Sequence, residues 1–178
     1  MRDTGNQLKI VLLYEVKAEI LLDFTLVNRF AFSQNFNFKE DHFTLYGQKQ
    51  GIIQSIIDSQ RGFYYTYCAL DKSGKVIVVF ALKRLEGYDH NSCELTLIVD
   101  YRHHGKGLGK TMIQEAIRIA FEDLKFHRIE GSILIDNQAA IKCFESNGFV
   151  LEGKQKEHVF INEKWHDTFL YALVNSNG

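Results

Sequence analysis

The residues best suited to chemistry lie in one short run, residues 102–111, with the sequence RHHGKGLGKT. Glycines at this density let a backbone turn sharply and approach a ligand closely. A loop that leads directly into a helix presents backbone N–H groups to an anion, most often a phosphate. Arg102, Lys106 and Lys110 add positive charge to this run. The sequence therefore predicts a phosphate-binding loop here.

Two nucleotide-binding patterns fit the loop poorly. A mononucleotide loop requires G-x-x-x-x-G-K-[ST], and the run ends correctly in GKT, but His104 stands where the first glycine belongs. A dinucleotide fingerprint requires G-x-G-x-x-G; Gly105 and Gly107 begin it, and Lys110 occupies the third glycine position. A kinase or NTPase is thus a distant alternative, and a dinucleotide-binding protein is disfavoured.

A third pattern, [RQ]-x-x-G-x-[GA], is met by residues 102–107. Two further motifs accompany it: E-x-x-x-x-V from Glu94 to Val99, and N-x-x-A-x-x-x-F-x-x-x-G-F from Asn137 to Phe149. With these motifs in order, residues 93–150 resemble the GNAT superfamily of acyl-CoA N-acetyltransferases. The branch of ribosomal-protein N-terminal and spermidine acetyltransferases is the most similar. The resemblance implies an α/β fold whose mixed central sheet contains a splayed parallel strand pair and carries helices on both faces.

The resemblance also implies that the phosphate is the pyrophosphate of acetyl-CoA, used as co-substrate without a metal. Backbone groups of one strand would hold the pantetheine arm, the loop would hold the pyrophosphate, and an asparagine and an aromatic ring would complete the site. The predicted coenzyme-binding residues are Leu97, Ile98, Val99, Arg102, His104, Gly105, Lys106, Gly107, Leu108, Gly109, Lys110, Asn137 and Phe144. Asn137 also suits a plain helix N-cap, and the two roles are compatible.

Glu94 is the predicted catalytic residue. Only a neutral amine attacks a thioester, so a base must remove the ammonium proton, and many relatives carry a carboxylate at this place. The alternative is a glutamate that pairs with a neighbouring cation. Phe144 departs from the family pattern, because many relatives have a tyrosine there as the acid for the departing thiolate. The acid is left unassigned; Phe144 either packs beside the coenzyme or fills the core.

Hydrophobic patterning supplies the elements that would position these groups. Strands are predicted at residues 8–14, 61–70, 75–84, 93–100, 127–135, 148–161 and 165–174. Helices are predicted at about 15–32, 43–59, 107–125 and 138–146. The alternation in CELTLIVD places Glu94, Thr96 and Ile98 on one strand face. We expect one domain over residues 1–178.

Composition narrows the class of protein. The net charge of −1 gives no global attraction to nucleic acid, and no apolar run is long enough for a membrane helix. Three widely spaced cysteines indicate reduced thiols in a cytoplasmic protein. The expected partner is a small-molecule or peptide amine, with a homodimer possible because relatives often pair. A non-catalytic acyl-CoA-binding or regulatory module on the same fold is the alternative function.

Overall fold

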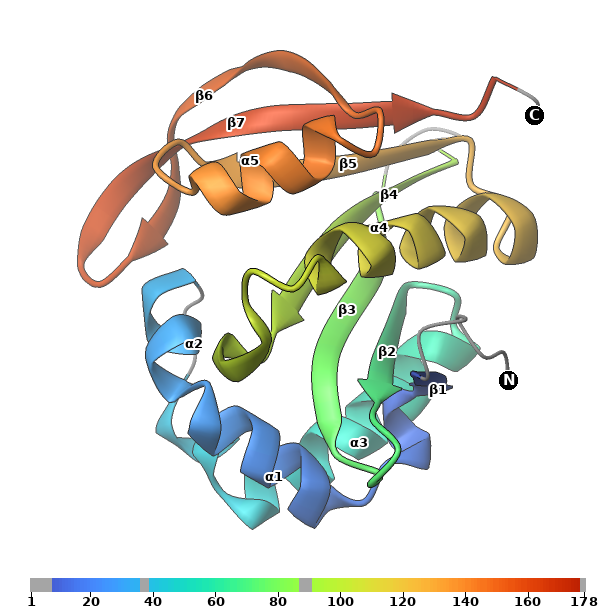
Figure 1. Cartoon of the computed structure of the whole chain (residues 1–178), viewed down its shortest axis with the longest axis vertical. Coiled ribbons are helices and arrows are strands. Elements are labelled where there is room, and N and C mark those ends of the chain that lie inside the picture. The colour runs from blue at the N-terminus through green and yellow to red at the C-terminus, as the bar shows by residue number, and fades with distance from the viewer. Residues whose placement is uncertain (1–7, 36–38, 87–90, 177–178) are drawn as a thin grey trace.

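The computed structural model describes residues 8–35, 39–86 and 91–176. One seven-stranded sheet has the order β1-β2-β3-β4-β5-β7-β6, with helices on both faces (Figure 1). Its strands are β1 (Lys9–Leu12), β2 (Tyr64–Leu70), β3 (Val76–Arg84), β4 (Ser92–Val99), β5 (Arg128–Leu134), β6 (Val150–Ile161) and β7 (Lys164–Val174). The helices are α1 (Ala18–Val27), α2 (Arg29–Asn35), α3 (Leu45–Gln60), α4 (Leu108–Arg118) and α5 (Gln138–Glu145). This confirms the predicted mixed α/β fold.

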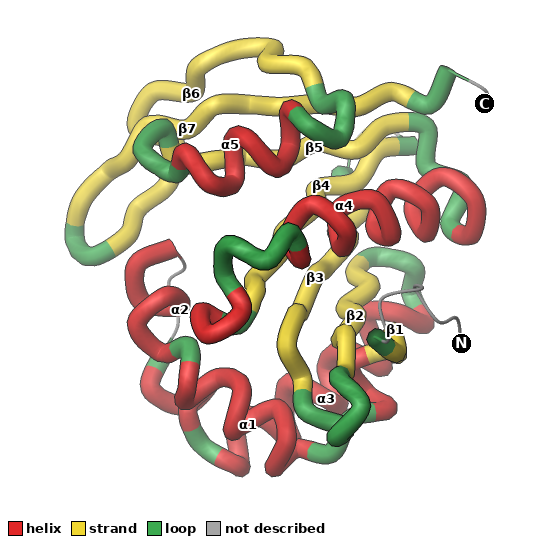
Figure 2. Tube along the Cα trace, viewed as in Figure 1, coloured by secondary structure: helices red, strands yellow, loops and turns green. Residues whose placement is uncertain are grey.

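The sheet consists of two antiparallel halves joined by one parallel pair, β4 with β5. That pair extends over only three residue pairs and stops at Glu94 with Glu130. On its other side, β4 stays paired with β3 as far as Val99. Figures 1 and 2 show β4 and β5 diverging beyond this point. The predicted splay is therefore confirmed, and it exposes the edge of β4 that faces β5.

The two faces of β4 meet different helices. Cys93 and Leu95 are buried in the cluster that includes Ile113 and Ala116 of α4. Ile98 packs instead with the cluster that contains residues of α1. Since side chains alternate along a strand, Glu94 lies on the same face as Ile98. The catalytic candidate and helix α4 are thus on opposite sides of the sheet.

The N-terminal helical segment is not one helix. The prediction of a continuous helix over residues 15–32 was wrong, because α1 ends at Val27 and α2 begins at Arg29. Asn28 between them is 1% exposed. Its side-chain Nδ2 donates to the Phe24 carbonyl (2.9 Å), and its Oδ1 accepts from the backbone N–H of Tyr101 (2.9 Å). The hydrogen bond to Tyr101, 73 residues away in the chain, is a contact at this break that sequence periodicity does not reveal.

Two other elements depart from regular geometry. Helix α4 ends at Arg118 and continues as a single π-helical turn over Ile119–Asp123, so helical structure stops two residues short of the predicted end at about residue 125. The hairpin of β6 and β7 was predicted correctly. Its turn residues Asn162 and Glu163 both have positive φ (51° and 61°), as a tight two-residue hairpin turn requires.

Candidate functional site

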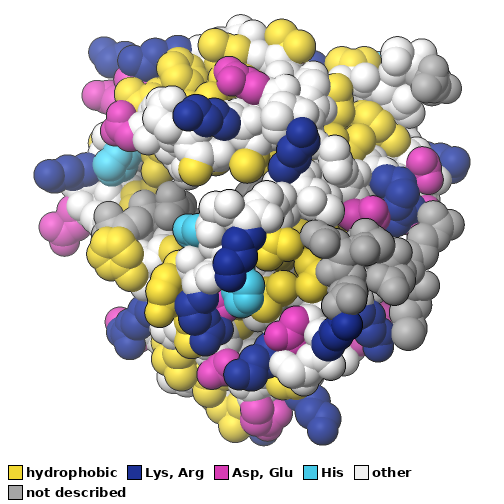
Figure 3. Space-filling view, viewed as in Figure 1, with side chains coloured by type: hydrophobic (Ala, Val, Ile, Leu, Met, Phe, Trp, Pro, Cys, Tyr) yellow, Lys and Arg dark blue, Asp and Glu magenta, His cyan; other side chains and the backbone are white. Residues whose placement is uncertain are grey.

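The glycine-rich loop lies between the end of β4 and the start of α4. Gly105 and Gly107 have φ of 73° and 77°, the left-handed region that a side chain rarely tolerates. Gly107 is the N-cap of α4, which leaves the first backbone N–H groups of the helix pointing out of its N-terminus. Figure 3 shows basic and histidine side chains gathered over the middle of this face. The arrangement suits an anion, because the donors and the helix dipole act together.

A buried aspartate that the sequence analysis missed anchors the loop. Asp100 is fully buried, and its carboxylate accepts hydrogen bonds from the backbone N–H of Arg102 (3.0 Å) and from the guanidinium Nε (3.0 Å). Burial would raise the pKa of Asp100, but the hydrogen bonds from Arg102 outweigh it and hold that pKa below its usual value. The charge of Arg102 is therefore engaged within the protein. Its role toward a phosphate stays a prediction.

The other polar side chains of the loop differ in their hydrogen bonds and in their exposure to solvent. His104 Nε2 lies 3.0 Å from the Val99 carbonyl, which ties the loop to the end of β4. Lys106 is exposed, and its Nζ donates to the Arg102 carbonyl at 3.2 Å. Lys110 is exposed on the first turn of α4. Arg102 is exposed too but is paired with Asp100, so among the described residues the two lysines are the loop's Lys and Arg side chains that no carboxylate engages.

Gly109 allows α4 to approach its neighbours closely. A Cβ at this position would lie 3.3 Å from Cys143 Sγ on α5 and 4.0 Å from a Val99 methyl on β4. Leu108 beside it packs with Leu97 and Val99 in one core cluster. The helix N-terminus is therefore held against the end of β4, next to the strand edge that β5 leaves open.

Glu94 lies where the parallel pair ends. Glu94 is paired with Lys83 on β3 and with Glu130 on β5, so the three side chains share one sheet face. Glu130 already accepts a hydrogen bond from Arg128 Nε at 2.7 Å. Burial is the main cause that raises the pKa of Tyr64, on the same half of the sheet. The negative charge of Glu94 raises it further, while a hydrogen bond with Thr96 acts in the opposite direction. Glu94 is half-buried and sits at the base of the splay.

The downstream motif has mainly structural contacts. Asn137 caps α5, because its Oδ1 accepts from the Ala140 N–H at 3.1 Å. The Phe144 ring is 6% exposed and packs on Phe149, with ring centroids 4.6 Å apart. A Cβ on Gly131 of β5 would come within 2.3 Å of this ring, so the glycine makes room for it. Of the two readings of Phe144, filling the core is the one that these contacts describe.

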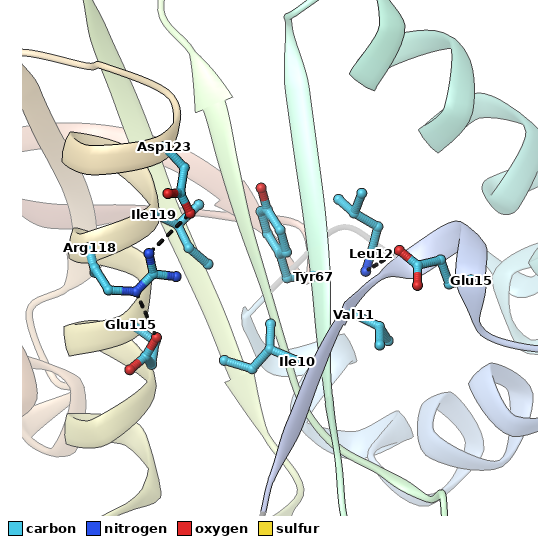
Figure 4. A pocket seen from close by; sticks show the side chains of 9 residues that line it. All are labelled: Ile10, Val11, Leu12, Glu15, Tyr67, Glu115, Arg118, Ile119 and Asp123. Carbon is cyan, nitrogen blue, oxygen red and sulfur yellow. Dashed lines mark hydrogen bonds and ion pairs between the residues drawn. The ribbon is translucent and has the colours of Figure 1, made fainter. Parts of the chain in front are cut away.

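A separate pocket lies on the other side of α4, against the edge strand β1 (Figure 4). Arg118 from α4 bridges Glu115 at 3.1 Å and Asp123 at 3.1 Å along one wall. Tyr67, with a pKa raised to about 12 chiefly by burial, stands between this wall and β1. The pocket contains none of the predicted site residues. Within the described ranges no group of histidine, cysteine and acidic residues could hold a metal ion, and no helix could span a membrane.

Comparison with known proteins agrees with this geometry. Residues 23–170 match the family model described as the acetyltransferase (GNAT) domain. A curated relative, spermidine N(1)-acetyltransferase of Vibrio cholerae, is 36% identical over 89 residues. That match spans 50% of this chain and about half of the relative's length (51%).

Solved structures extend the likeness to nearly the whole chain. Ribosomal-protein-S5-alanine acetyltransferase from Vibrio fischeri superimposes with a TM-score of 0.88 at 21% identity, covering 97% of this chain and 95% of that one. Spermidine N-acetyltransferase from Vibrio cholerae, solved in complex with CoA and spermine, gives a TM-score of 0.78 at 26% identity, covering 96% of each chain.

Proposed function

The chain belongs to the GNAT acetyltransferase family, and from that premise we propose that it transfers the acetyl group of acetyl-CoA directly to a primary amine. The observation that carries the proposal is the junction of β4, β5 and α4. An open strand edge, a glycine-rich turn and a helix N-terminus meet there, beside a half-buried carboxylate. The strand edge suits the pantetheine arm of acetyl-CoA, the turn and the helix N-terminus suit its pyrophosphate, and the carboxylate suits the amine.

Acetyl-CoA would be held by main-chain groups along its length. The open edge of β4 at Leu97, Ile98 and Val99 would pair with the amides of the pantetheine arm as another strand would. The pyrophosphate would lie at the N-terminus of α4, where the N–H groups of Leu108, Gly109 and Lys110 have no place in the helix ladder. Lys106 and Lys110 would supply charge that is not already engaged by a carboxylate.

Glu94 would act as the base. It lies where β4 and β5 separate, on the face opposite α4, so an amine entering from that face would meet the thioester beside it. Glu94 would take the ammonium proton, and the amine lone pair would attack the carbonyl carbon. A C–N bond forms, the C–S bond breaks, the sulfur leaves as thiolate, and the nitrogen gives up its second proton to water. A thiol with a pKa near 8.5 is a tolerable leaving group without an acid, and Phe144 has no proton to give.

Three reduced cysteines fit the cytoplasmic location that we propose. For the acceptor, spermidine is what the Vibrio cholerae relative's name specifies, and a protein amine is what the Vibrio fischeri structure's name specifies. Both classes carry a primary amine, and both remain candidates for this chain.

The test is mass-spectrometric detection of acetylated product. Purified protein and acetyl-CoA are incubated with N-terminal peptides, polyamines and aminoglycosides in separate reactions. Acetylation of one class, abolished on boiling the protein, would support the proposal and name the acceptor. A protein whose melting temperature rises with acetyl-CoA, but which acetylates none of these amines, would instead favour the non-catalytic coenzyme-binding module.

A further inference from the structure

A chain of polar side chains crosses the C-terminal half of the sheet. Ser132 Oγ donates to Gln155 Oε1 at 3.3 Å, and Thr168 Oγ1 donates to the same oxygen at 3.0 Å. His158 Nδ1 lies 2.9 Å from Thr168 Oγ1. Three strands, β5, β7 and β6, thus contribute to one hydrogen-bonded chain. Thr168 at its centre is 1% exposed, while Ser132 and Gln155 are half-buried and His158 is exposed.

This row of hydrogen-bonded side chains shares a sheet face with the catalytic candidate, Glu94. Glu130 is the partner of Glu94 in the parallel pair, and Ser132 follows two residues later on the same face. Thr168 is the partner of Leu134, which lies two residues beyond Ser132. Helices α1 and α3 pack over β3 and β2 on this side, whereas α2 approaches β6. The row of hydrogen-bonded side chains therefore borders the face from which an amine would reach the thioester.

A distortion of β6 aims His158 at this face. Between the pairs of Gln155 with Thr168 and of Val159 with His166, three residues of β6 face one residue of β7. Glu157 within this bulge has a φ of 50°, an uncommon conformation for a residue with a side chain. Its N–H donates to Asp167 Oδ1 at 2.8 Å, which fixes the bulge. Bulges of this kind commonly redirect a side chain next to an active site.

The hydrogen-bond pattern determines what His158 offers. Gln155 Oε1 accepts both hydroxyl protons, so the Thr168 oxygen is left to accept from the ring. The proton of a neutral ring then lies on Nδ1, and the acceptor lone pair lies on Nε2. Three of the nearby acids are held in ion pairs, since Arg128 pairs with Glu130 and Glu152, and Lys154 with Asp167. Within the described part of the chain, the exposed Glu157 beside His158 forms no ion pair, so apart from Glu94 this surface offers one free carboxylate and the neutral acceptor of His158 rather than the cluster of carboxylates that suits a polycation.

We propose that His158 is a specificity-determining residue that accepts a hydrogen bond from a backbone N–H of a peptide acceptor, as an extension of the acetyl transfer proposed above. Leu134, level with Thr168, is four residues beyond Glu130, which corresponds to about 13 Å along a strand. Thr168 also lies two strands away from Glu94 across the sheet, which adds about 10 Å at right angles and gives a separation of about 16 Å. An extended peptide spans that distance with about five residues. A peptide whose N-terminus lies at Glu94 reaches His158 with its fifth or sixth residue, and a single amino acid does not.

The experiment compares a hexapeptide amide with the corresponding single amino-acid amide, and with spermidine, in the wild-type chain and in His158→Ala. We expect the KM for the hexapeptide to rise about three- to tenfold, as loss of one hydrogen bond implies. The KM values for acetyl-CoA and for the single amino-acid amide should stay within about twofold. Thr168→Val, which removes the hydroxyl that orients the ring, should show the same selectivity for length.

His127→Ala is the matched control, because His127 is an exposed histidine just before the opposite end of β5. If His158→Ala lowers the melting temperature, His158→Gln retains most of the side-chain volume and gives a second measurement. The inference would be refuted if His158→Ala had equal effects on the peptide amide and the single amino-acid amide, or no effect on either. A preference for spermidine that His158→Ala does not change would also refute it. A wild-type chain that acetylates no amine would refute the proposed function itself.

Discussion

Adding one methyl group at Gly131 tests how tightly α5 is packed on the sheet. The new Cβ would lie 2.3 Å and 2.7 Å from two ring carbons of Phe144, well below any ordinary contact. The ring has little room to yield, because Phe149 and Tyr171 flank it with centroids at 4.6 Å and 6.4 Å. Overpacking of this kind costs about 1–3 kcal/mol. We expect Gly131→Ala to lower the melting temperature by about 4–8 °C for a cost near 2 kcal/mol.

A double-mutant cycle separates this contact from a general intolerance of the strand. Phe144→Leu removes the two ring carbons nearest to the new methyl and leaves a contact at about the 3.3 Å of the remaining carbon. In that background Gly131→Ala should cost little, so the coupling should offset most of the single-mutant loss. Urea unfolding of the four proteins measures it. Additive effects in the cycle would show that the ring does not press on Gly131, and would reopen a coenzyme-facing role for Phe144.

Three further changes have defined outcomes. Glu94→Gln should lower kcat by about 100-fold or more at neutral pH if it removes the base, and an unchanged pH–rate profile would contradict that role. Asn28→Ala leaves a loop N–H without its acceptor and should cost about 1–3 kcal/mol in urea unfolding while weakening acetyl-CoA binding by calorimetry; Thr25→Val, in the preceding helix α1, should leave that binding unchanged. Arg128→Ala removes the hydrogen bond that lowers the pKa of Glu152. In the wild type this hydrogen bond stabilises the fold at pH values above the carboxyl pKa of the unfolded chain, and the stabilisation is lost as the pH falls. The variant should therefore lose less stability than the wild type between about pH 5 and pH 3, measured by urea midpoints.

Local patterns were sufficient to predict most of the strands. Alternation in CELTLIVD follows from burial on one face, and the structure confirms it. The glycines at 105 and 107 could be predicted because their chemistry is local: each occupies a left-handed conformation. Asn137 was predicted as a cap for the same reason, since its acceptor is the N–H three residues later.

The features that sequence reasoning missed depend on residues far apart in the chain. The contact of Asn28 with Tyr101 joins positions 73 residues apart, and no helical period records it. Thr168 looks like an ordinary strand residue until β6 and β5 bring Gln155 and Ser132 to it. Asp100 had a local signal that could have found it, because an aspartate two residues before an arginine can accept from that residue's backbone and side chain together.

The short parallel joint between β4 and β5 also bears on how the chain folds. Strands β1–β4 pair only with one another up to that joint, and β5, β7 and β6 form a second antiparallel set. The pairs β2–β3, β3–β4 and β6–β7 join strands that are near one another in the chain and are fast to form, whereas β1–β2 and β5–β7 join more distant segments. We expect two cooperative units with separate hydrogen-exchange protection, the first able to form during synthesis before the second emerges. The strand edge that we propose as the coenzyme site is then also the seam at which the two units dock.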